Sequence, residues 1–382
     1  MATSLMCKTL GAVCLGISMA CAPTVALAIA DVIDTPAYPT ELAPKNLLND
    51  VARAGNRIVA VGERGHIIYS DNEGQSWTQA EVPVSVTLTG LDFGSDTQGW
   101  AVGHSGVVLH SGDAGATWTL QLTGVKAAEL AIANQEKAIA ELEARIETAP
   151  EDKKNELELT LDDLSYDLGN MQSDMDIGPV NPFLDVWFAD DKQGFVVGAY
   201  GMFVHTEDGG KTWQDWSLRL DNSDNFHLNA VTRIGGGALV IVGEAGQIYV
   251  SVDQGVTWEK RDSPYAGSLF GVAGTGRMNE ILAFGLRGTL MFSTDLGKSW
   301  SMVSTGSTAT LNDGFAKDNR VVLVGNEGAV LTSSNGGDTF RAYLRDDRQG
   351  IMSVVPMMSG TDLLLVGEGG VYITDSQGKN LQ

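Results

Sequence analysis

The chain has 382 residues, of which 46 are glycine and only 10 are proline. It carries 48 acidic and 25 basic residues, a net charge of −23. This acidity argues against a protein that binds nucleic acid or lies on anionic lipid, because both need a basic footprint. Hydrophobic residues make up 43% of the chain, so the acidity does not indicate a disordered chain.

Residues 1–30 have the pattern of a secretory signal peptide. Their single charged side chain is Lys8, an apolar run from Leu10 to about Ala22 follows, and small residues near Ala28 and Ala30 frame a cleavage site. A transmembrane anchor is the other interpretation, but the run is short and Pro23 interrupts it. We therefore expect an exported protein with no direct membrane span after cleavage, in the periplasm or a compartment like the thylakoid lumen.

The cysteines sharpen this expectation. Cys7, Cys14 and Cys21 all lie within the signal segment, so the mature chain would contain no cysteine and no disulfide. Lipidation at Cys21 is an alternative, since the small residue Ala20 precedes it, although Ser18 fits a lipoprotein signal poorly.

A repeat dominates the remaining sequence. Each copy reads apolar-Gly-x-x-Gly, about four β-forming residues, and then a box Ser/Thr-x-Asp-x-Gly-x-Thr/Ser-Trp. The copies span 61–77, 102–118, 197–213, 242–258, 284–300, 324–340 and, without the final aromatic residue, 366–378. Their first glycines, Gly62, Gly103, Gly198, Gly243, Gly285, Gly325 and Gly367, are spaced by 41, 95, 45, 42, 40 and 42 residues.

A period of about 40–45 residues with several short strands is typical of β-propeller blades. We therefore predict an all-β, seven-bladed propeller over residues 31–382. The box lies between the third and fourth strands of each blade, and Gly-x-x-Gly lies at the other end. The last repeat lacks a fourth strand, so we expect residues 34–42 to supply it and close the ring.

The box residues have a structural interpretation. The aspartate accepts hydrogen bonds from its own turn, the glycine supplies positive φ, and the tryptophan packs between blades. The aspartates are Asp113, Asp208, Asp253 and Asp295, with Asn72 and Asn335 in two other copies, and the tryptophans are Trp77, Trp118, Trp213, Trp258 and Trp300.

The anomalous spacing of 95 contains an insertion at about residues 126–176. Ile132, Ile139 and Ile146 are seven residues apart, and an apolar series with 4-3-4-3 spacing runs from Leu157 to Met171 after Pro150. This heptad pattern predicts an antiparallel, coiled-coil helical hairpin. A hairpin folded onto the propeller and a projecting one are both compatible with the pattern, and we favour projection. As a crossing between blades, the insertion belongs to the Gly-x-x-Gly face.

The repeat resembles the photosystem II stability and assembly factor family, a seven-bladed class within the wider Asp-box, or bacterial neuraminidase repeat, proteins. The resemblance covers residues 34–382 apart from the insertion. It implies a chaperone-like role in assembling a membrane complex, photosystem II in photosynthetic organisms. Related exported propellers in non-photosynthetic bacteria accompany transporters. The long insertion departs from the photosynthetic pattern.

Enzymatic alternatives have weaker support. A sialidase or other glycosidase needs paired carboxylates and, for sialidases, an arginine cluster with a tyrosine nucleophile. No Phe-Arg-Ile-Pro-type signature precedes the first box, and the box aspartates belong to the opposite face. A carbohydrate-binding module is a third interpretation. We expect a non-catalytic protein without a cofactor.

Other ligand motifs are incomplete. His110 and His205 occupy equivalent third-strand positions, but no cluster with zinc-type spacing accompanies them. Residues 221–225 resemble a Ca²⁺ loop only loosely, and Gly-x-x-Gly lacks the Lys-Ser/Thr of a phosphate loop. We therefore expect no metal site.

The Gly-x-x-Gly face remains the candidate binding surface. Its turns carry Arg64, His104, Tyr200 and Arg287, and arginine pairs bidentately with carboxylates. The alternative is that these are ordinary turn residues. We expect a monomeric scaffold or assembly factor that binds a protein partner, such as a photosystem or a transporter, and no nucleic acid.

Overall fold

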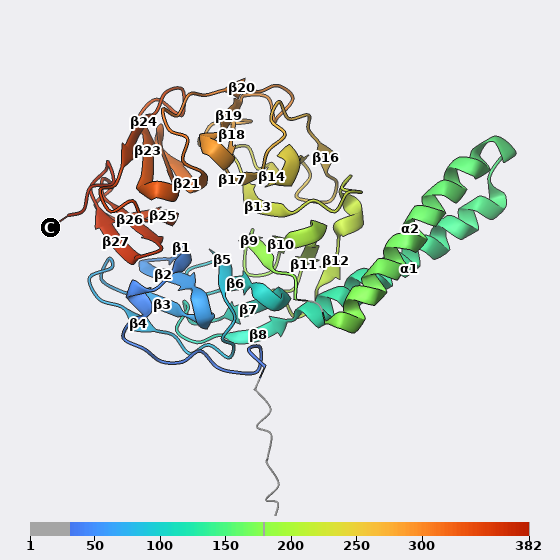
Figure 1. The fold of residues 1–382 in the computed structure, drawn as a ribbon, viewed down its shortest axis with the longest axis horizontal. Coiled ribbons are helices and arrows are strands. Elements are labelled where there is room, and N and C mark those ends of the chain that lie inside the picture. Colours follow the sequence, from blue (N-terminus) through green and yellow to red (C-terminus); the bar gives the residue numbers. More distant parts are fainter. Residues whose placement is uncertain (1–30, 179, 382) are drawn as a thin grey trace, which may run out of the picture. The chain divides into compact units, whose positions relative to one another are not determined.

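The computed structural model describes residues 31–178 and 180–381. The predicted signal peptide and Cys21 lie outside the described residues. From Val32 onward the chain forms one unit, in which the described residues make seven antiparallel sheets arranged as a ring (Figure 1). The prediction of a seven-bladed propeller is confirmed.

Four layers of strands surround the central channel. The innermost strands contact one another around the ring and are β1 (Leu48–Ala54), β5 (Leu88–Phe93), β9 (Phe183–Phe188), β13 (Leu228–Arg233), β17 (Leu269–Ala273), β21 (Leu311–Lys317) and β25 (Ile351–Pro356). The second strands are β2 (Arg57–Gly62), β6 (Gly99–Gly103), β10 (Gly194–Gly198), β14 (Leu239–Gly243), β18 (Ile281–Gly285), β22 (Arg320–Gly325) and β26 (Leu363–Gly367).

The two outer layers are shorter. The third strands are β3 (Ile67–Ser70), β7 (Val107–Ser111), β11 (Phe203–Thr206), β15 (Ile248–Ser251), β19 (Leu290–Ser293), β23 (Ala329–Ser333) and β27 (Gly370–Thr374). The outermost strands are β4 (Thr78–Gln79), β8 (Thr119–Leu122), β12 (Gln214–Asp215), β16 (Glu259–Lys260), β20 (Ser301–Met302) and β24 (Arg341–Leu344).

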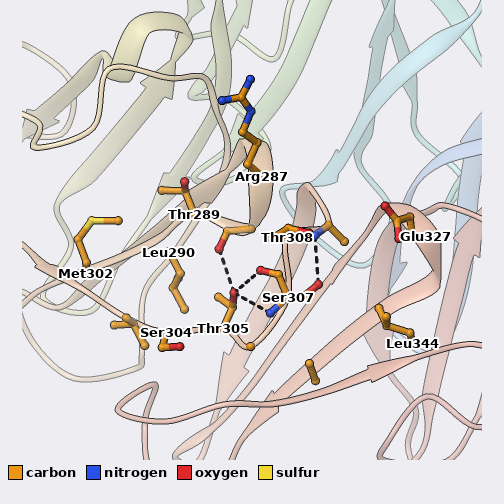
Figure 2. Close-up of a pocket in the computed structure, with 15 residues that line it drawn as sticks. Arg287, Thr289, Leu290, Met302, Ser304, Thr305, Ser307, Thr308, Glu327 and Leu344 are labelled. Carbon is orange, nitrogen blue, oxygen red and sulfur yellow. Dashed lines mark hydrogen bonds between the residues drawn. The ribbon is translucent and has the colours of Figure 1, made fainter.

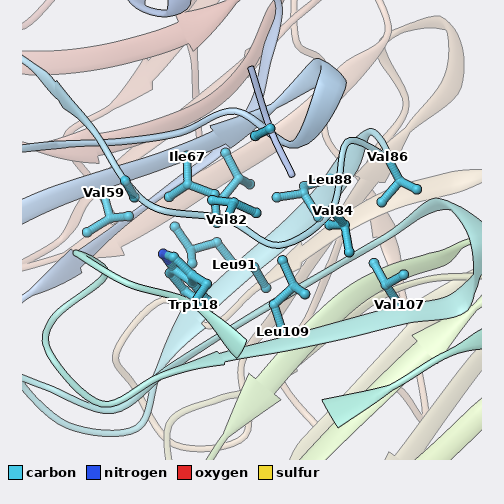
Figure 3. Packing of buried hydrophobic residues seen from close by; sticks show 14 of the residues in the cluster. Val59, Ile67, Val82, Val84, Val86, Leu88, Leu91, Val107, Leu109 and Trp118 are labelled. Atoms are coloured by element: carbon cyan, nitrogen blue, oxygen red, sulfur yellow. The ribbon is translucent and has the colours of Figure 1, made fainter. Parts of the chain in front are cut away.

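Apolar side chains fill the spaces between blades, because each sheet buries both faces against its neighbours. In the cluster of Figure 3, Val59 and Ile67 of blade one meet Leu91, Leu109 and Trp118 of blade two. Corresponding clusters lie between the other neighbouring blades, including blades seven and one. Continuous β-branched and aliphatic second strands, buried along their length, supply most of this core.

The insertion forms α1 (Gly124–Thr148) and α2 (Glu151–Ile177). The Thr123 side chain caps α1 by accepting from the N–H of Lys126, and Leu142 is buried in the seam between the two helices. No described side chain of α2 is buried, and Figure 1 shows the hairpin extending away from the ring. The heptad prediction of a hairpin is confirmed.

The predicted closing strand at 34–42 is wrong. Blade seven has three strands, and its outer edge is met by the chain's own C-terminal residues, where Asn380 bridges Thr374 and Leu381 donates to Ile373. Residues 32–40 instead run along blade one: the N–H of Ala37 donates to Val82 and that of Ser85 to Val32. The ring is therefore closed by packing and not by a shared sheet.

Eight 3₁₀ turns complete the described secondary structure. Six of them form the Gly-x-x-Gly turns: η2 (Glu63–Gly65), η3 (His104–Gly106), η4 (Ala199–Gly201), η6 (Glu244–Gly246), η7 (Leu286–Gly288) and η8 (Asn326–Gly328). The other two are η1 (Ala43–Lys45) before β1 and η5 (Ser217–Arg219) after β12.

Candidate functional site

The Gly-x-x-Gly turns share one backbone conformation, which the two glycines make possible. A Cβ on Gly285 would lie 2.4 Å from the carbonyl oxygen of Ser268. Gly288 has φ of +72°, and its Cβ would lie 2.2 Å from the oxygen of Ser307. The turn is therefore pressed against the crossing from one blade to the next, and a side chain fits only at its two central positions.

The second of those central positions is left-handed although it is not glycine. Its φ is 57° in Arg64, 54° in Tyr200 and 59° in Arg287, and Ser105, Ala245 and Glu327 are alike. Non-glycine residues adopt this region at a small cost. The result is that one exposed side chain per turn stands on the same face of the ring.

Three of the predicted residues occupy this position, and the fourth precedes it. Arg64, Tyr200 and Arg287 are exposed, as is His104 at the first central position of its turn. They lie on blades one, two, three and five, and no described hydrogen bond or ion pair joins any two of them. The structure brings them to one face without gathering them into a single cluster.

The charges on this face are unevenly compensated. Glu327 lies 3.5 Å from Arg348, and Glu244 lies 3.9 Å from His227. Within the described chain, neither Arg64 nor Arg287 makes an ion pair. Exposed guanidinium groups without a carboxylate are available to an acidic partner. Tyr200 is more constrained, since its ring packs edge-on against His227, with centroids 4.7 Å apart.

A groove of about 680 Å³ lies beside one of these arginines. In Figure 2, Arg287 stands at one end of the residues that line it, and Glu327 and Leu344 lie on the opposite side. Between them run Thr305, Ser307 and Thr308 of the crossing from blade five to blade six. It is an open, largely hydroxyl-lined surface rather than an enclosed active-site pocket.

The boxes lie at the opposite ends of the strands and serve their own turns. In blade two, Asp113 accepts from the N–H of Thr117 at 2.9 Å and from its hydroxyl at 2.7 Å, and Ser111 donates to it at 2.8 Å. Trp118 donates from Nε1 to the carbonyl of Gly115. Asp208, Asp253 and Asp295 make corresponding bonds. These aspartates are occupied by the turn and not offered to a ligand.

A second group of carboxylates, which the sequence interpretation missed, lines the channel. Asp50, Asp185 and Asp313 lie at the third position of an inner strand, and Asp92 at the fifth. Each accepts a backbone N–H from another blade: Leu91 donates to Asp50, Phe188 to Asp92, Val231 to Asp185 and Val354 to Asp313. The signal was present as apolar-x-Asp at the start of three repeats.

Burial changes the protonation of these channel carboxyls. It raises the pKa of Asp185 to about 7 and that of Asp92 to about 6. Burial, together with the charges of Asp313 and Asp185, raises the pKa of Asp50 well above its usual range. The Ser353 hydroxyl lies 2.8 Å from Asp50 and 2.7 Å from Asp313. One hydroxyl has one hydrogen, so a protonated carboxyl completes this bridge.

The paired histidines are not ligands of a common ion. His110 bonds to Gln98 at 2.9 Å, whereas His205 stacks on Trp216 with centroids 3.8 Å apart, and burial lowers its pKa to about 4. Among residues 31–178 and 180–381, no group of three metal-ligating side chains is close enough to hold an ion. No helix in that same part of the chain is long and apolar enough to cross a membrane.

Comparison with known proteins adds a family. The family described as "Photosynthesis system II assembly factor YCF48" matches residues 170–263. "Photosystem II assembly lipoprotein Ycf48" of Synechococcus sp. (strain CC9902) is 29% identical over 203 residues, which are 52% of this chain and 60% of the relative. Its namesake from Parasynechococcus marenigrum (strain WH8102) is 28% identical over 205 residues, 53% of this chain and 61% of the relative. The chain thus spans about three fifths of the length of these curated relatives.

Solved structures extend the likeness around the ring. "YCF48 bound to D1 peptide" has a TM-score of 0.59 at 15% identity and covers 87% of this chain and 94% of that one. "YCF48 from Cyanidioschyzon merolae" has a TM-score of 0.57 at 16% identity, covering 88% and 97%. At these identities the structures show the fold alone. Together with the sequence matches, they confirm the resemblance to the photosystem II assembly factor family.

Proposed function

We propose that this chain is an exported assembly factor that binds an exposed protein segment of a membrane complex through its Gly-x-x-Gly face. The observation that carries the proposal is the row of outward-pointing turn side chains, in which Arg64 and Arg287 have no described carboxylate partner. A net charge of −23 makes unpaired arginines on one face stand out as a local attraction for an acidic segment.

The relatives give the kind of partner. Those with the strongest sequence matches are named as photosystem II assembly proteins, and one structure of the same fold holds a D1 peptide. We extend the same task to this chain: a subunit of a photosystem, or of a transporter if the source is not photosynthetic. Three of those relatives' names include "lipoprotein", which supports an exported location for this chain as well.

We propose further that the protein is non-catalytic. A glycosidase would need one free acid and one free base or nucleophile. The close channel pair, Asp50 and Asp313, has oxygens already engaged by Leu91, Val354 and the Ser353 hydroxyl. Carboxyl oxygens held by backbone N–H groups act as fasteners between blades, which favours a scaffold over a hydrolase or a carbohydrate-binding module.

Affinity capture from solubilised membranes of the source organism tests the proposal. The native chain is compared with a double variant, Arg64→Gln and Arg287→Gln, and with a matched control, Lys211→Gln and Lys298→Gln, which removes two charges beside the boxes. We expect a subunit of one membrane complex to be recovered with the native and control chains and about tenfold less with the arginine variant. Equal recovery with all three chains would contradict the proposal.

A further inference from the structure

The groove beside Arg287 is formed by the crossing from blade five to blade six, residues 303–309, together with Met302 and the turn of blade six at Glu327 (Figure 2). Ser304 and Thr308 of this crossing are exposed. The same crossing exists in every blade, so the other repeats show what normally occupies this position.

In blade one, the crossing is covered by another stretch of the same chain. Residues 62–88 correspond without a gap to 285–311, so Glu81, Val82 and Ser85 match Ser304, Thr305 and Thr308. The Ala37 N–H donates to Val82 at 3.1 Å, and the Ser85 N–H donates to Val32 at 2.8 Å. An extended segment, residues 32–37, therefore lies along this crossing and pairs with its main chain.

Blade two adds a second set of bonds to the same crossing. Glu81 donates its N–H to Ala116 at 3.1 Å and accepts from Trp118 at 2.9 Å. Both polar groups of the Glu81 main chain are thereby satisfied, as buried or strand-edge backbone requires.

Blade five has neither cover. Within the described chain, the main-chain groups of Ser304, Thr305 and Thr308 make no hydrogen bond. The backbone here differs in detail from blade one, since Gly306 has φ of +69° where Pro83 stands. What the two crossings share is a run of main-chain donors and acceptors, paired in blade one and open in blade five.

Blade four shows a different way of filling the position. Its crossing forms the same hydroxyl-capped turn: Tyr265 donates its N–H to Ser263 at 3.2 Å, as Ser307 does to Thr305 at 3.4 Å. The Tyr265 side chain then reaches the carbonyl oxygen of Leu286, with its hydroxyl at 3.1 Å. Ser307 replaces that tyrosine in blade five, and the space left by the smaller side chain is part of the groove.

The charge at the groove selects its occupant. Arg287 lies at one end without a described carboxylate, whereas Glu327 on the other side faces Arg348 at 3.5 Å. An acidic group at the arginine end would gain a charge-assisted, bidentate pair. Open backbone along the crossing would hold an extended chain by strand-type hydrogen bonds.

We propose that this groove binds an extended, acidic peptide segment of a partner protein, paired with the main chain of residues 304–308 and anchored by a carboxylate on Arg287. The inference rests on the proposed function and names the site and the mode of binding. Residues 32–37 on blade one are the internal example of that mode.

The test uses the chain without residues 1–30 and a fluorescein-labelled octapeptide of alternating threonine and glutamate, with fluorescence anisotropy as the readout. We expect saturable binding, which weakens about tenfold in Arg287→Gln, a change equivalent to about 1.4 kcal/mol. The same peptide with glutamine in place of glutamate should bind at least tenfold more weakly. Lys298→Gln removes one charge from the box end of the same blade and should leave the affinity unchanged.

Ser307→Tyr gives a second, independent variant. It installs the side chain that blade four already carries, so the ring should fold with an unchanged melting temperature while the peptide no longer binds. No saturable binding by the native chain, or equal affinity in Arg287→Gln and Ser307→Tyr, would overturn the inference. Membrane-complex capture can still succeed in that case, so failure of the groove is distinguishable from failure of the proposed function.

Discussion

Aspartate plays two opposite parts in this ring, and its surroundings decide which. In the boxes, hydroxyl and backbone donors hold the carboxylate, and they lower the pKa of Asp253 and Asp295 to about 2. In the channel, burial raises the pKa of Asp185 to about 7 despite bonds from Val231 and Val186. Acidification therefore removes stabilisation at the boxes and adds it in the channel.

Replacing Asp185 tests the channel half of this statement. Its folded pKa lies above the unfolded value, so its contribution to stability is complete below about pH 4 and is lost as the pH rises toward 7. In Asp185→Asn that loss is absent. Relative to the native chain, the free energy of unfolding of the variant should rise by about 1–2 kcal/mol between pH 4 and pH 8, less than the full shift because the carboxyl is half-buried. Urea unfolding at both pH values measures it, and a flat difference would contradict the assignment.

Asp253 tests the box. Its carboxylate accepts from the N–H and hydroxyl of Thr257 and from the hydroxyl of Ser251. Asn72 accepts from its own turn in the same way, so Asp253→Asn should be tolerated near pH 7. Asp253→Ala leaves the donors unpaired and should lower the free energy of unfolding by about 1 kcal/mol. A thermal melt of the two variants against the native chain separates these outcomes, and equal melting temperatures would refute a structural role.

At the scale of elements, the helical hairpin is nearly independent of the ring. Its attachment consists of Ala127 packed in the core between blades two and three, and of Asn134, whose amide lies 2.8 Å from Asp215. Because no described side chain of α2 is buried, most of the hairpin contributes little to the stability of the propeller. A long acidic arm kept without a folding role is suited to contacts outside the ring.

Replacing residues 128–175 by a short glycine-serine linker should leave the ring folded. The expected change in melting temperature is a few degrees at most, because Ala127 stays in place and only the bond from Asn134 is lost. Calorimetry checks stability, and circular dichroism checks the loss of helix. An unfolded ring would show that the hairpin is part of the core.

Elements with a strong local pattern could be predicted from the sequence. The period of the glycines determined the blades, and the heptads from Ile132 to Met171 predicted the helices. The segment 34–42 could not be placed, because an edge pairs with whichever segment reaches it. Residues 379–381 meet β27, and Ala37 pairs with Val82 instead.

The candidate site divides in the same way. The turn positions of Arg64 and Arg287 follow from the repeat, since local spacing determines them. The link from Asp50 through Ser353 to Asp313 does not, because Asp50 and Ser353 are 303 residues apart. Only closure of the ring brings them together, and no periodic pattern in one repeat indicates it.

At the scale of the whole molecule, the seam between blades seven and one replaces the expected closing strand. Apolar side chains including Leu48, Ile58 and Leu364 pack across it. The Arg53 guanidinium donates to the carbonyl of Pro356 and pairs with Glu73, which accepts in turn from the N–H of Met358. Closure by packing alone makes this seam the place where the loss of one side chain matters most.

Arg53→Ala tests the seam against Arg233→Ala, its counterpart on β13. Arg53 is largely buried and bonded across blades, whereas Arg233 is exposed and lies over Trp187 at 5.8 Å. We expect losses of about 2–3 kcal/mol and under about 1 kcal/mol in the free energy of unfolding. Equal losses would show that the seam has no special role in closure.

Cross-linking mass spectrometry of the captured complex, with a lysine-reactive reagent, tests the central claim that one face of the ring binds the partner. Lys45 precedes β1 near the turn of blade seven and Lys126 begins the hairpin beside η3, whereas Lys211 and Lys298 lie in boxes on the other face. The account predicts partner cross-links at Lys45 and Lys126. Cross-links confined to Lys211 and Lys298 would contradict it.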